Sequence, residues 1–329
     1  MTKLLNEKEL LQGVNLIRDG GLVAFRTETV YGLGADATNE SAVKKVFAAK
    51  TRPTNNPLIV HFHSLKHLLE FFPDISATER DLLKKIPDAL TLVLPNPKDS
   101  KIAPACLAGQ KTVAVRIPSC KFARKFIMAC GVPLAAPSAN TSTRPSPTRW
   151  QDVYDDLNKR IDAIFMGKRT KVGLESTVIQ ATADKINVLR LGGASVKKIE
   201  SVAKLPTQIV ASSPKSPGTK HRHYTPSVPL HVLTRNEIKE KANDGHNIIL
   251  CLNKNKNHYR NFHVIALGNS ATAVGQNLFP AMREAEKIIA DLRSNNTGFE
   301  KVAETILVEK MPEGEAFVVI NERLSKASS

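Results

Sequence analysis

The sequence predicts an α/β protein in which a twisted mixed-sheet domain is followed by a smaller domain built on a parallel sheet. Apolar runs of strand length alternate with amphipathic segments of helical period over residues 1–204. No carboxylate occurs between Glu200 and Glu237, and residues 205–228 are rich in proline, serine and threonine. The alternation restarts over residues 229–329, so we place the two domains on either side of a basic linker.

The first domain is expected to begin with a helix over Asn6–Arg18, because Asn6 suits the N-cap and Glu9 completes a capping box. A strand over Leu22–Phe25 follows, and Thr27–Gly34 (TETVYGLG) is interpreted as a loop. Further strands are expected at Leu58–Phe62, Thr91–Leu94, Thr112–Ile117, Pro133–Ala136, Ile161–Met166, Ser176–Gln180 and Ile186–Leu191, and further helices at about 41–49, 121–129 and 148–159.

The second domain repeats this alternation on a smaller scale. Strands separated by helices favour a small, parallel, Rossmann-like sheet. Because the segment lacks a GxGxxG motif, no dinucleotide site is predicted there. The strands are expected at Leu230–Leu233, Ile248–Leu252, Val264–Leu267 and Thr305–Val308, and the helices at about 236–242 and 271–292.

The charge balance favours a polyanionic partner. The chain has 47 lysines and arginines against 31 acids, a net charge of +16, which suits a nucleic acid or a phosphate-bearing ligand. An aromatic content of 5% gives little support to RNA binding by base stacking, so only weak binding of tRNA or other RNA is expected.

No apolar run approaches the roughly 20 residues that a membrane-spanning helix needs, so no membrane partner is expected. The N-terminal residues carry acids and lack the apolar core of a secretory signal. Cys106, Cys120, Cys130 and Cys251 share no CxxC spacing and are expected to be single thiols rather than metal ligands. We therefore expect a cytoplasmic protein without a protein-bound metal.

Charged and polar side chains occur where predicted elements end. Lys50 and Arg52 close a helix, Asn56 turns the chain toward the next strand, and His61 lies near the end of that strand. We expect these side chains near one edge of the sheet, where ligands bind in open α/β folds. We expect both cations at an exposed helix end, and taken singly they are more typical of a helix C-terminus. His61 taken singly is more typical of a buried structural histidine.

Strand periodicity places Thr112 and Arg116 on one face of a strand whose other face carries Val113, Val115 and Ile117. A hydroxyl and a guanidinium on one face suit an anionic ligand. An amphipathic strand with a solvated arginine has the same pattern, so this strand alone does not establish an anion site.

Two hydroxyl-rich loops and one further arginine add to this pattern: Ala136–Thr148 (APSANTSTRPSPT), Gly173–Thr177 and Arg190. Each lies where a predicted strand begins or ends. The sequence has no P-loop, nucleophile elbow or HExxH motif. Together these segments favour a phosphate site that works without a protein nucleophile.

These segments resemble the long-form, YrdC-like threonylcarbamoyl-AMP synthases, in which a catalytic domain is followed by an accessory domain. The likeness covers nearly the whole chain, and its combination of motifs is specific. It rests on Phe25–Ala37, Lys50–His61, Thr112–Pro118, Ala136–Thr148, Gly173–Ile179, Leu189–Gly193, Ser216–Pro226, Asn277–Lys287 and the terminal AFVVINERLSKAS.

The resemblance implies a nucleotidyltransferase that joins L-threonine, bicarbonate or CO2, and ATP into threonylcarbamoyl-AMP and releases pyrophosphate. Mg2+ would enter with ATP, and partner proteins would pass the threonylcarbamoyl group to adenosine 37 of tRNAs that read ANN codons. Lys50 and Arg52 would be the catalytic cations. The implied ATP contacts are Lys50, Arg52, Asn56, Thr112, Ser138, Asn140, Ser146, Arg190 and Tyr224, and the implied threonine contacts are Thr29, His61, Arg116, Ala136 and Ser176.

The chain departs from the family pattern at three places that surround the implied pocket. Arg26 replaces a proline before TETVYG, Asp88-Ala89 replaces a Gly-Pro pair, and Met166–Lys168 replaces DGG. None of these changes removes an implied contact. They leave open a paralogue with another carbamoyl-adenylate substrate, and the net charge leaves open an RNA-binding or regulatory protein on the same fold.

The basic linker also matches the family. Lys215, Lys220 and Arg222 are concentrated in it, next to Tyr224. We hypothesise that this segment forms a lid over the bound nucleotide, because a passive tether needs no Arg-His-Tyr sequence at a defined position.

Overall fold

The structure is a computed structural model that describes residues 1–210, 223–242, 247–295 and 304–328. The chain forms two compact units. One consists of Met1–Ser142 and Pro147–His221, and the other of Thr143–Ser146 and Arg222–Ser329. Most of the expected lid, residues 211–222, lies outside the described residues. The domain limits at residues 204 and 229 stay a prediction.

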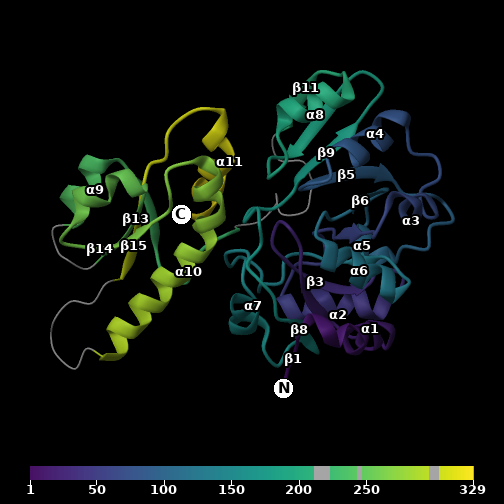
Figure 1. Ribbon diagram of the computed structural model, residues 1–329, viewed down its shortest axis with the longest axis horizontal. Helices are drawn as coiled ribbons and strands as arrows, with labels where there is room; N and C mark the ends of the chain where they lie inside the picture. The colour runs from purple at the N-terminus through teal and green to yellow at the C-terminus, as the bar shows by residue number, and fades with distance from the viewer. Residues whose placement is uncertain (211–222, 243–246, 296–303, 329) are drawn as a thin grey trace. The chain divides into compact units, whose positions relative to one another are not determined.

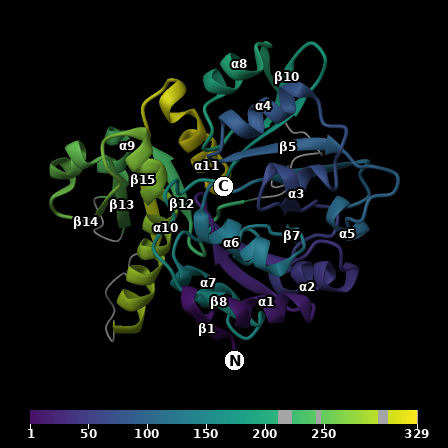
Figure 2. The same ribbon diagram turned by 45° about the vertical axis from the view of Figure 1, so that its right-hand side comes forward.

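A mixed sheet of eleven strands forms the centre of the first unit (Figures 1 and 2). Parallel and antiparallel pairs both occur in it, so the prediction of a mixed sheet is confirmed. The strand order is β1 (Lys3–Leu5), β8 (Ala163–Phe165), β2 (Val23–Arg26), β3 (Tyr31–Asp36), β7 (Leu134–Ala135), β4 (Ile59–His61), β6 (Thr112–Arg116), β5 (Leu90–Pro95), β9 (Thr177–Ala181), β10 (Ile186–Arg190) and β11 (Thr207–Ile209).

The interpretation of Thr27–Gly34 as a loop is wrong for its second half. Tyr31 begins strand β3, which pairs antiparallel with β2 and places Gly32 opposite Phe25. A Cβ atom on Gly34 would lie 2.9 Å from the Phe25 ring, so the close approach of the two strands requires glycine there. Glycines weaken the apolar alternation by which a strand is recognised, and this explains the error.

Helices cover both faces of the large sheet. The capping box of Asn6 and Glu9 is present, although the first turn is a 3-10 helix (Glu7–Glu9) and the α-helix starts at Leu10. The sequence did not predict α3, α4, α5 or α8. The helices are α1 (Leu10–Arg18), α2 (Glu40–Lys50), α3 (Leu65–Leu69), α4 (Ala77–Lys85), α5 (Pro104–Leu107), α6 (Lys121–Cys130), α7 (Trp150–Leu157) and α8 (Val196–Ala203).

Alternate residues of each central strand belong to different core clusters. On β2, Val23 and Phe25 pack with α1 and α6, whereas Ala24 packs with the helices of the opposite face. On β6, Val113 and Val115 belong to the cluster that contains Ala24, and Ala114 belongs to a third, smaller cluster. The expected two faces of β6 are therefore confirmed.

The second unit contains a parallel sheet with the order β12 (Leu230–Leu233), β15 (Thr305–Glu309), β13 (Asn247–Cys251) and β14 (His263–Ala266). All of its described pairs are parallel, as predicted. Its helices are α9 (Arg235–Lys241), α10 (Ala271–Asn295) and α11 (Val318–Ala327), and α10 and α11 lie side by side (Figures 1 and 2). Within the described part of the chain, no helix combines the length and apolar character needed to cross a bilayer.

Candidate functional site

Lys50 is buried, with 1% of its surface exposed, so the expectation that it lies at an exposed helix end is wrong. It is the last residue of α2, and its ammonium donates to the backbone carbonyls of Ser138 and Asn140. Burial and, secondarily, the charge of Arg52 lower the pKa of Lys50, whereas the two carbonyl acceptors favour its charged form. Lys50 thus fixes the Ser-Ala-Asn loop.

The backbone of this loop is also held by strand β3. Ser138 forms an isolated antiparallel bridge with Gly32, and the Ala139 amide donates to the carbonyl of Tyr31 at 2.8 Å. The Ser142 amide in turn donates to the carbonyl of Lys50 at 2.8 Å. The cation and the hydroxyl-rich loop, which are 88 residues apart in sequence, therefore form one preorganised structure.

Arg52 and Asn56 lie before strand β4, level with Thr112 at the start of the parallel strand β6. The Arg52 guanidinium donates to the carbonyl of Asn56 at 3.2 Å and to that of Pro57 at 2.9 Å. His61, by contrast, ends β4. The expectation that Arg52, Asn56 and His61 share one edge of the sheet is wrong, because the short strand separates them.

His61 and Arg116 are neighbours at the carboxyl ends of β4 and β6, where they are paired in register. Both are buried, with 2% and 4% of their surfaces exposed. Burial, and secondarily the charge of Arg116, lower the pKa of His61 to about 3, so the imidazole is neutral at physiological pH. Thr112 lies on the same face as Arg116, but four residue steps, or about 13 Å, away along the strand.

Ser176 lies directly before β9, which strand β5 separates from β6 and Arg116. Its hydroxyl is 2.7 Å from that of Thr91, a residue that the sequence did not assign to the site. The buried Arg190 guanidinium donates to the Ser176 carbonyl at 2.8 Å and to its hydroxyl at 3.2 Å. In this structure Arg190 therefore positions Ser176.

The turn between β2 and β3 brings Thr29 to the same region. The hydroxyls of Thr27 and Thr29 are 2.9 Å apart, and the amide of Gly173 donates to the Thr29 carbonyl at 3.1 Å. The turn also contains Glu28, which binds Arg116 and which the sequence did not single out. Its partner is 88 residues away, so local sequence carries no signal for the pair.

Ala136 follows β7, and its amide donates to the carbonyl of Ile59 at 2.9 Å. Ser146 and Tyr224 belong to the second unit. Tyr224 is buried there against the Phe279 ring, with the ring centroids 5.2 Å apart, and the Arg323 guanidinium lies 5.1 Å from its centroid. These ring contacts give Tyr224 a structural role within the second unit.

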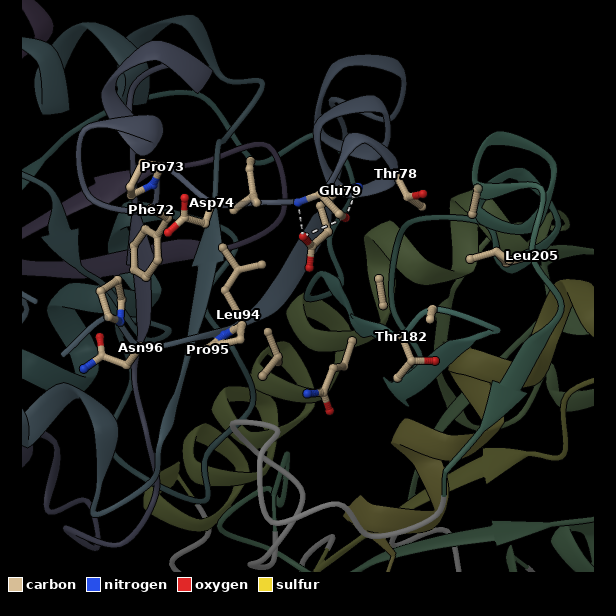
Figure 3. Close-up of a pocket in the computed structure, with 18 residues that line it drawn as sticks. Phe72, Pro73, Asp74, Thr78, Glu79, Leu94, Pro95, Asn96, Thr182 and Leu205 are labelled. Carbon is tan, nitrogen blue, oxygen red and sulfur yellow. Dashed lines mark hydrogen bonds between the residues drawn. The ribbon is translucent and has the colours of Figure 1, made fainter.

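Three cavities of the first unit differ in whether predicted site residues line them. One of about 810 Å³ borders Arg52, and one of about 670 Å³ borders Glu28. Figure 3 shows a third, of about 570 Å³, where β5 and β9 end, and none of the predicted site residues lines it. Of the predicted site residues, Arg52 is therefore the one that lines any of these three cavities.

Among the described residues, no group of three or more histidine, cysteine or acidic side chains could hold a metal ion. The predicted residues are instead cations, hydroxyls and amides, which are donors for phosphate and carboxylate oxygens. The fold and the predicted residues thus define a class: a two-unit α/β protein whose larger unit is built on a mixed sheet, with the predicted cations and hydroxyls near the ends of its strands.

The particular family follows from comparison with known proteins. A family model of Sua5, YciO and YrdC proteins, described as telomere recombination, matches residues 15–192. A model described as the C-terminal domain of threonylcarbamoyl-AMP synthase matches residues 194–329. The chain belongs to the threonylcarbamoyl-AMP synthase family, as its sequence motifs predict.

Relatives named threonylcarbamoyl-AMP synthase match along the full chain. The protein of Bacillus subtilis is 35% identical over 98% of this chain and 94% of its own length, and that of Pyrococcus abyssi is 35% identical over 100% and 98%. The crystal structure of P. abyssi Sua5 with L-threonine superposes with a TM-score of 0.85, at 34% identity, over 100% of this chain and 97% of that one. Escherichia coli YciO, at 22% identity and a TM-score of 0.54 over 60% of this chain and all of its own, shares the fold.

Proposed function

We propose that this protein joins L-threonine, bicarbonate or CO2, and ATP into threonylcarbamoyl-AMP and releases pyrophosphate. The observation that carries this proposal is the pair of polar groups along β4 and β6. Lys50 and the Ser138–Asn140 loop form one group, and His61 with Arg116 forms the other. A long substrate set, a triphosphate and an amino acid, needs cations at two separate positions.

In the proposed reaction, the amine of threonine adds to CO2 and loses a proton, which gives a carbamate. A carbamate oxygen then attacks the α-phosphorus of ATP, and the bond to the β-phosphate oxygen breaks as pyrophosphate leaves. Both reactants are anionic, so fixed positive charge and donors lower the barrier by positioning and electrostatics, without a protein nucleophile. Lys50 and Arg52 would face the phosphates, and Arg116 the carboxylate of threonine.

We further propose that Mg2+ enters with ATP, bound mainly by phosphate oxygens. The adenylate would serve proteins that modify adenosine 37 of tRNA. We place the reaction in the cytoplasm, and the four free thiols of the chain suit such a reducing compartment.

The proposal is tested by ATP–pyrophosphate exchange and by mass detection of threonylcarbamoyl-AMP. We expect exchange that depends on both threonine and bicarbonate. Arg116→Ala and Thr29→Ala should raise the threonine requirement more than the ATP requirement. Exchange with a different amino acid would indicate a paralogue with altered substrate, and RNA binding without any exchange would indicate an RNA-binding protein.

A further inference from the structure

A buried carboxylate, Glu28, lies against the predicted threonine site without having a role in it. Only 4% of its surface is exposed. One carboxylate oxygen accepts from Arg116 Nη2 and from the Ala89 amide at 3.2 Å. The other accepts from the amide of Cys120, the N-cap of α6, at 3.4 Å. Three separate segments therefore fix the position of this negative charge.

The arginine of this pair keeps capacity for another anion. Its side chain is 5% exposed, and its Nε atom is buried without a hydrogen-bond partner among the described residues. A guanidinium has five N–H donors, and Glu28 accepts from Nη2. Arg116 can therefore bind a substrate carboxylate in addition to Glu28.

Two carboxylates on one buried guanidinium leave an excess negative charge. Removing such a charge from water is costly unless another positive group balances it. The α-ammonium of an amino acid is attached one carbon from its carboxylate, so it reaches Glu28 when the carboxylate lies on Arg116. A hydroxy acid of the same shape brings the second negative charge without the balancing positive one.

We propose that Glu28 makes the initial binding step, before the amine forms the carbamate, selective for a zwitterionic α-amino acid, by opposing any carboxylate that binds Arg116 without an adjacent ammonium group. Glu28 is thus a specificity-determining residue. Glu28 also borders a cavity of about 670 Å³, which none of the predicted threonine contacts lines. Arg26, Lys121, Lys125 and Lys171 also border this cavity, as do the acids Glu7 and Asp88, and Arg26 pairs with Glu7.

This inference rests on the proposed binding of the threonine carboxylate to Arg116. The test measures, by calorimetry on the full-length protein, the affinities for L-threonine and for 2,3-dihydroxybutanoate of matching configuration, in which a hydroxyl replaces the amine. We expect the wild-type protein to prefer threonine by at least about 100-fold, since a buried polar group left unbalanced penalises an analogue strongly.

Glu28→Gln removes the charge and keeps the shape of the side chain. We expect weaker threonine binding, unchanged or tighter binding of the hydroxy acid, and a preference reduced by about tenfold or more. Glu309→Gln is the matched control, because Glu309 is 5% exposed and pairs with Arg235 at 3.2 Å in the second unit. That variant should keep the wild-type preference.

Equal loss of affinity for both ligands in Glu28→Gln would leave Glu28 a purely structural role and overturn the inference. If the variant fails to fold, the wild-type protein still decides, because equal affinity for the two ligands contradicts the proposal. Arg116→Lys separates the two levels of the argument. If Arg116→Lys leaves the affinity for threonine unchanged, the assignment of the threonine site is refuted. If Arg116→Lys weakens threonine binding but Glu28→Gln keeps the wild-type preference for threonine over the hydroxy acid, the inference about Glu28 alone is refuted.

Discussion

Lys50 is a predicted phosphate contact that also has a role in the fold. Its ammonium donates to two carbonyls of the Ser-Ala-Asn loop while it lies among the predicted phosphate contacts. Arg52, two residues later, is only partly buried and donates to the carbonyls of its own turn. The two cations therefore differ in structural role although the sequence places them side by side.

We predict that Lys50→Ala and Arg52→Ala each reduce adenylate formation by about 100-fold or more, because each removes a preorganised charge. Only Lys50→Ala should also destabilise the fold strongly, since it leaves two buried carbonyls without their donor at about 1–3 kcal/mol each. Urea unfolding and single-turnover product formation measure the two effects. Near-normal turnover in both variants would refute the phosphate assignment.

His61 gives a prediction about pH. Its pKa in the folded protein is about 3, below the ordinary value of 6.5. As the pH falls, His61 is protonated in the unfolded chain at a higher pH than in the folded protein. The contribution of the neutral imidazole to the free energy of unfolding is therefore complete above pH 6.5 and is lost as the pH falls toward 3. The loss can reach about 1.4 kcal/mol per pH unit.

The free energy of unfolding, measured in urea between pH 7 and pH 4, tests this prediction. His61→Asn should reduce the slope with pH by about one proton. His258→Asn, at an exposed histidine, should leave the slope unchanged. An identical slope in the His61 variant and the wild-type protein would contradict the assignment of a buried neutral imidazole.

At the scale of elements, the loop after β10 determines where the start of β9 lies. A Cβ atom on Gly192 would lie 2.3 Å from the carbonyl carbon of Ser176 and 2.5 Å from the Glu175 carbonyl oxygen. These are backbone atoms, which cannot move aside to relieve the clash as the end of a flexible side chain can. The glycine is therefore what allows β10 and its arginine to approach Ser176.

We predict that Gly192→Ala displaces Ser176 and raises the threonine requirement, with a loss of stability of about 1–3 kcal/mol from overpacking. Gly131→Ala, at the C-cap of α6, is the control, because a Cβ atom there would meet nothing within 4 Å while the φ of 76° alone costs stability. Steady-state kinetics with varied threonine and varied ATP distinguish the two substrates. Wild-type kinetics in Gly192→Ala would show that the loop adapts without affecting the site.

At the scale of the whole molecule, the division into two units indicates that the C-terminal third holds part of the predicted ATP-binding segment. The second unit includes Thr143–Ser146, part of a segment that the motifs assign to ATP binding. In that unit Arg144 forms a bidentate ion pair with Glu286 of α10, and Arg283 donates to the carbonyl of Pro145. Helix α10 thus holds a short piece of the predicted nucleotide-binding segment.

We predict that a chain ending after Val210 keeps its large sheet but loses most net product formation. All eleven strands of that sheet precede residue 210, whereas Thr143–Ser146 would lose its partners on α10. Circular dichroism and product detection measure the two properties. Replacement of Lys220–His223 by Gly and Ser in the full chain, with the buried Tyr224 retained, tests the lid separately. A truncated protein that forms and retains the adenylate would refute both roles.

Much of the architecture could be predicted from local patterns. The parallel small sheet, the helix capped by Asn6 and the two faces of β6 follow from periodicity and capping, which act over a few residues. Strand β3 escapes prediction because its glycines remove the apolar signal. Helix α8 could have been predicted, because Ser195 caps it and Ile199 and Ala203 share its buried face. The short helices α3 and α5 span five and four residues, too few for a clear helical period.

The sequence by itself determined the family and the kinds of side chain in the site, because motifs record which cations and hydroxyls the chemistry needs. Only the tertiary structure decided that Lys50 is buried, that its ammonium holds the Ser-Ala-Asn loop, and that Glu28 binds Arg116. Burial and ion pairing join segments separated by dozens of residues. Their energies depend on distances and dielectric surroundings that no local pattern in the chain encodes.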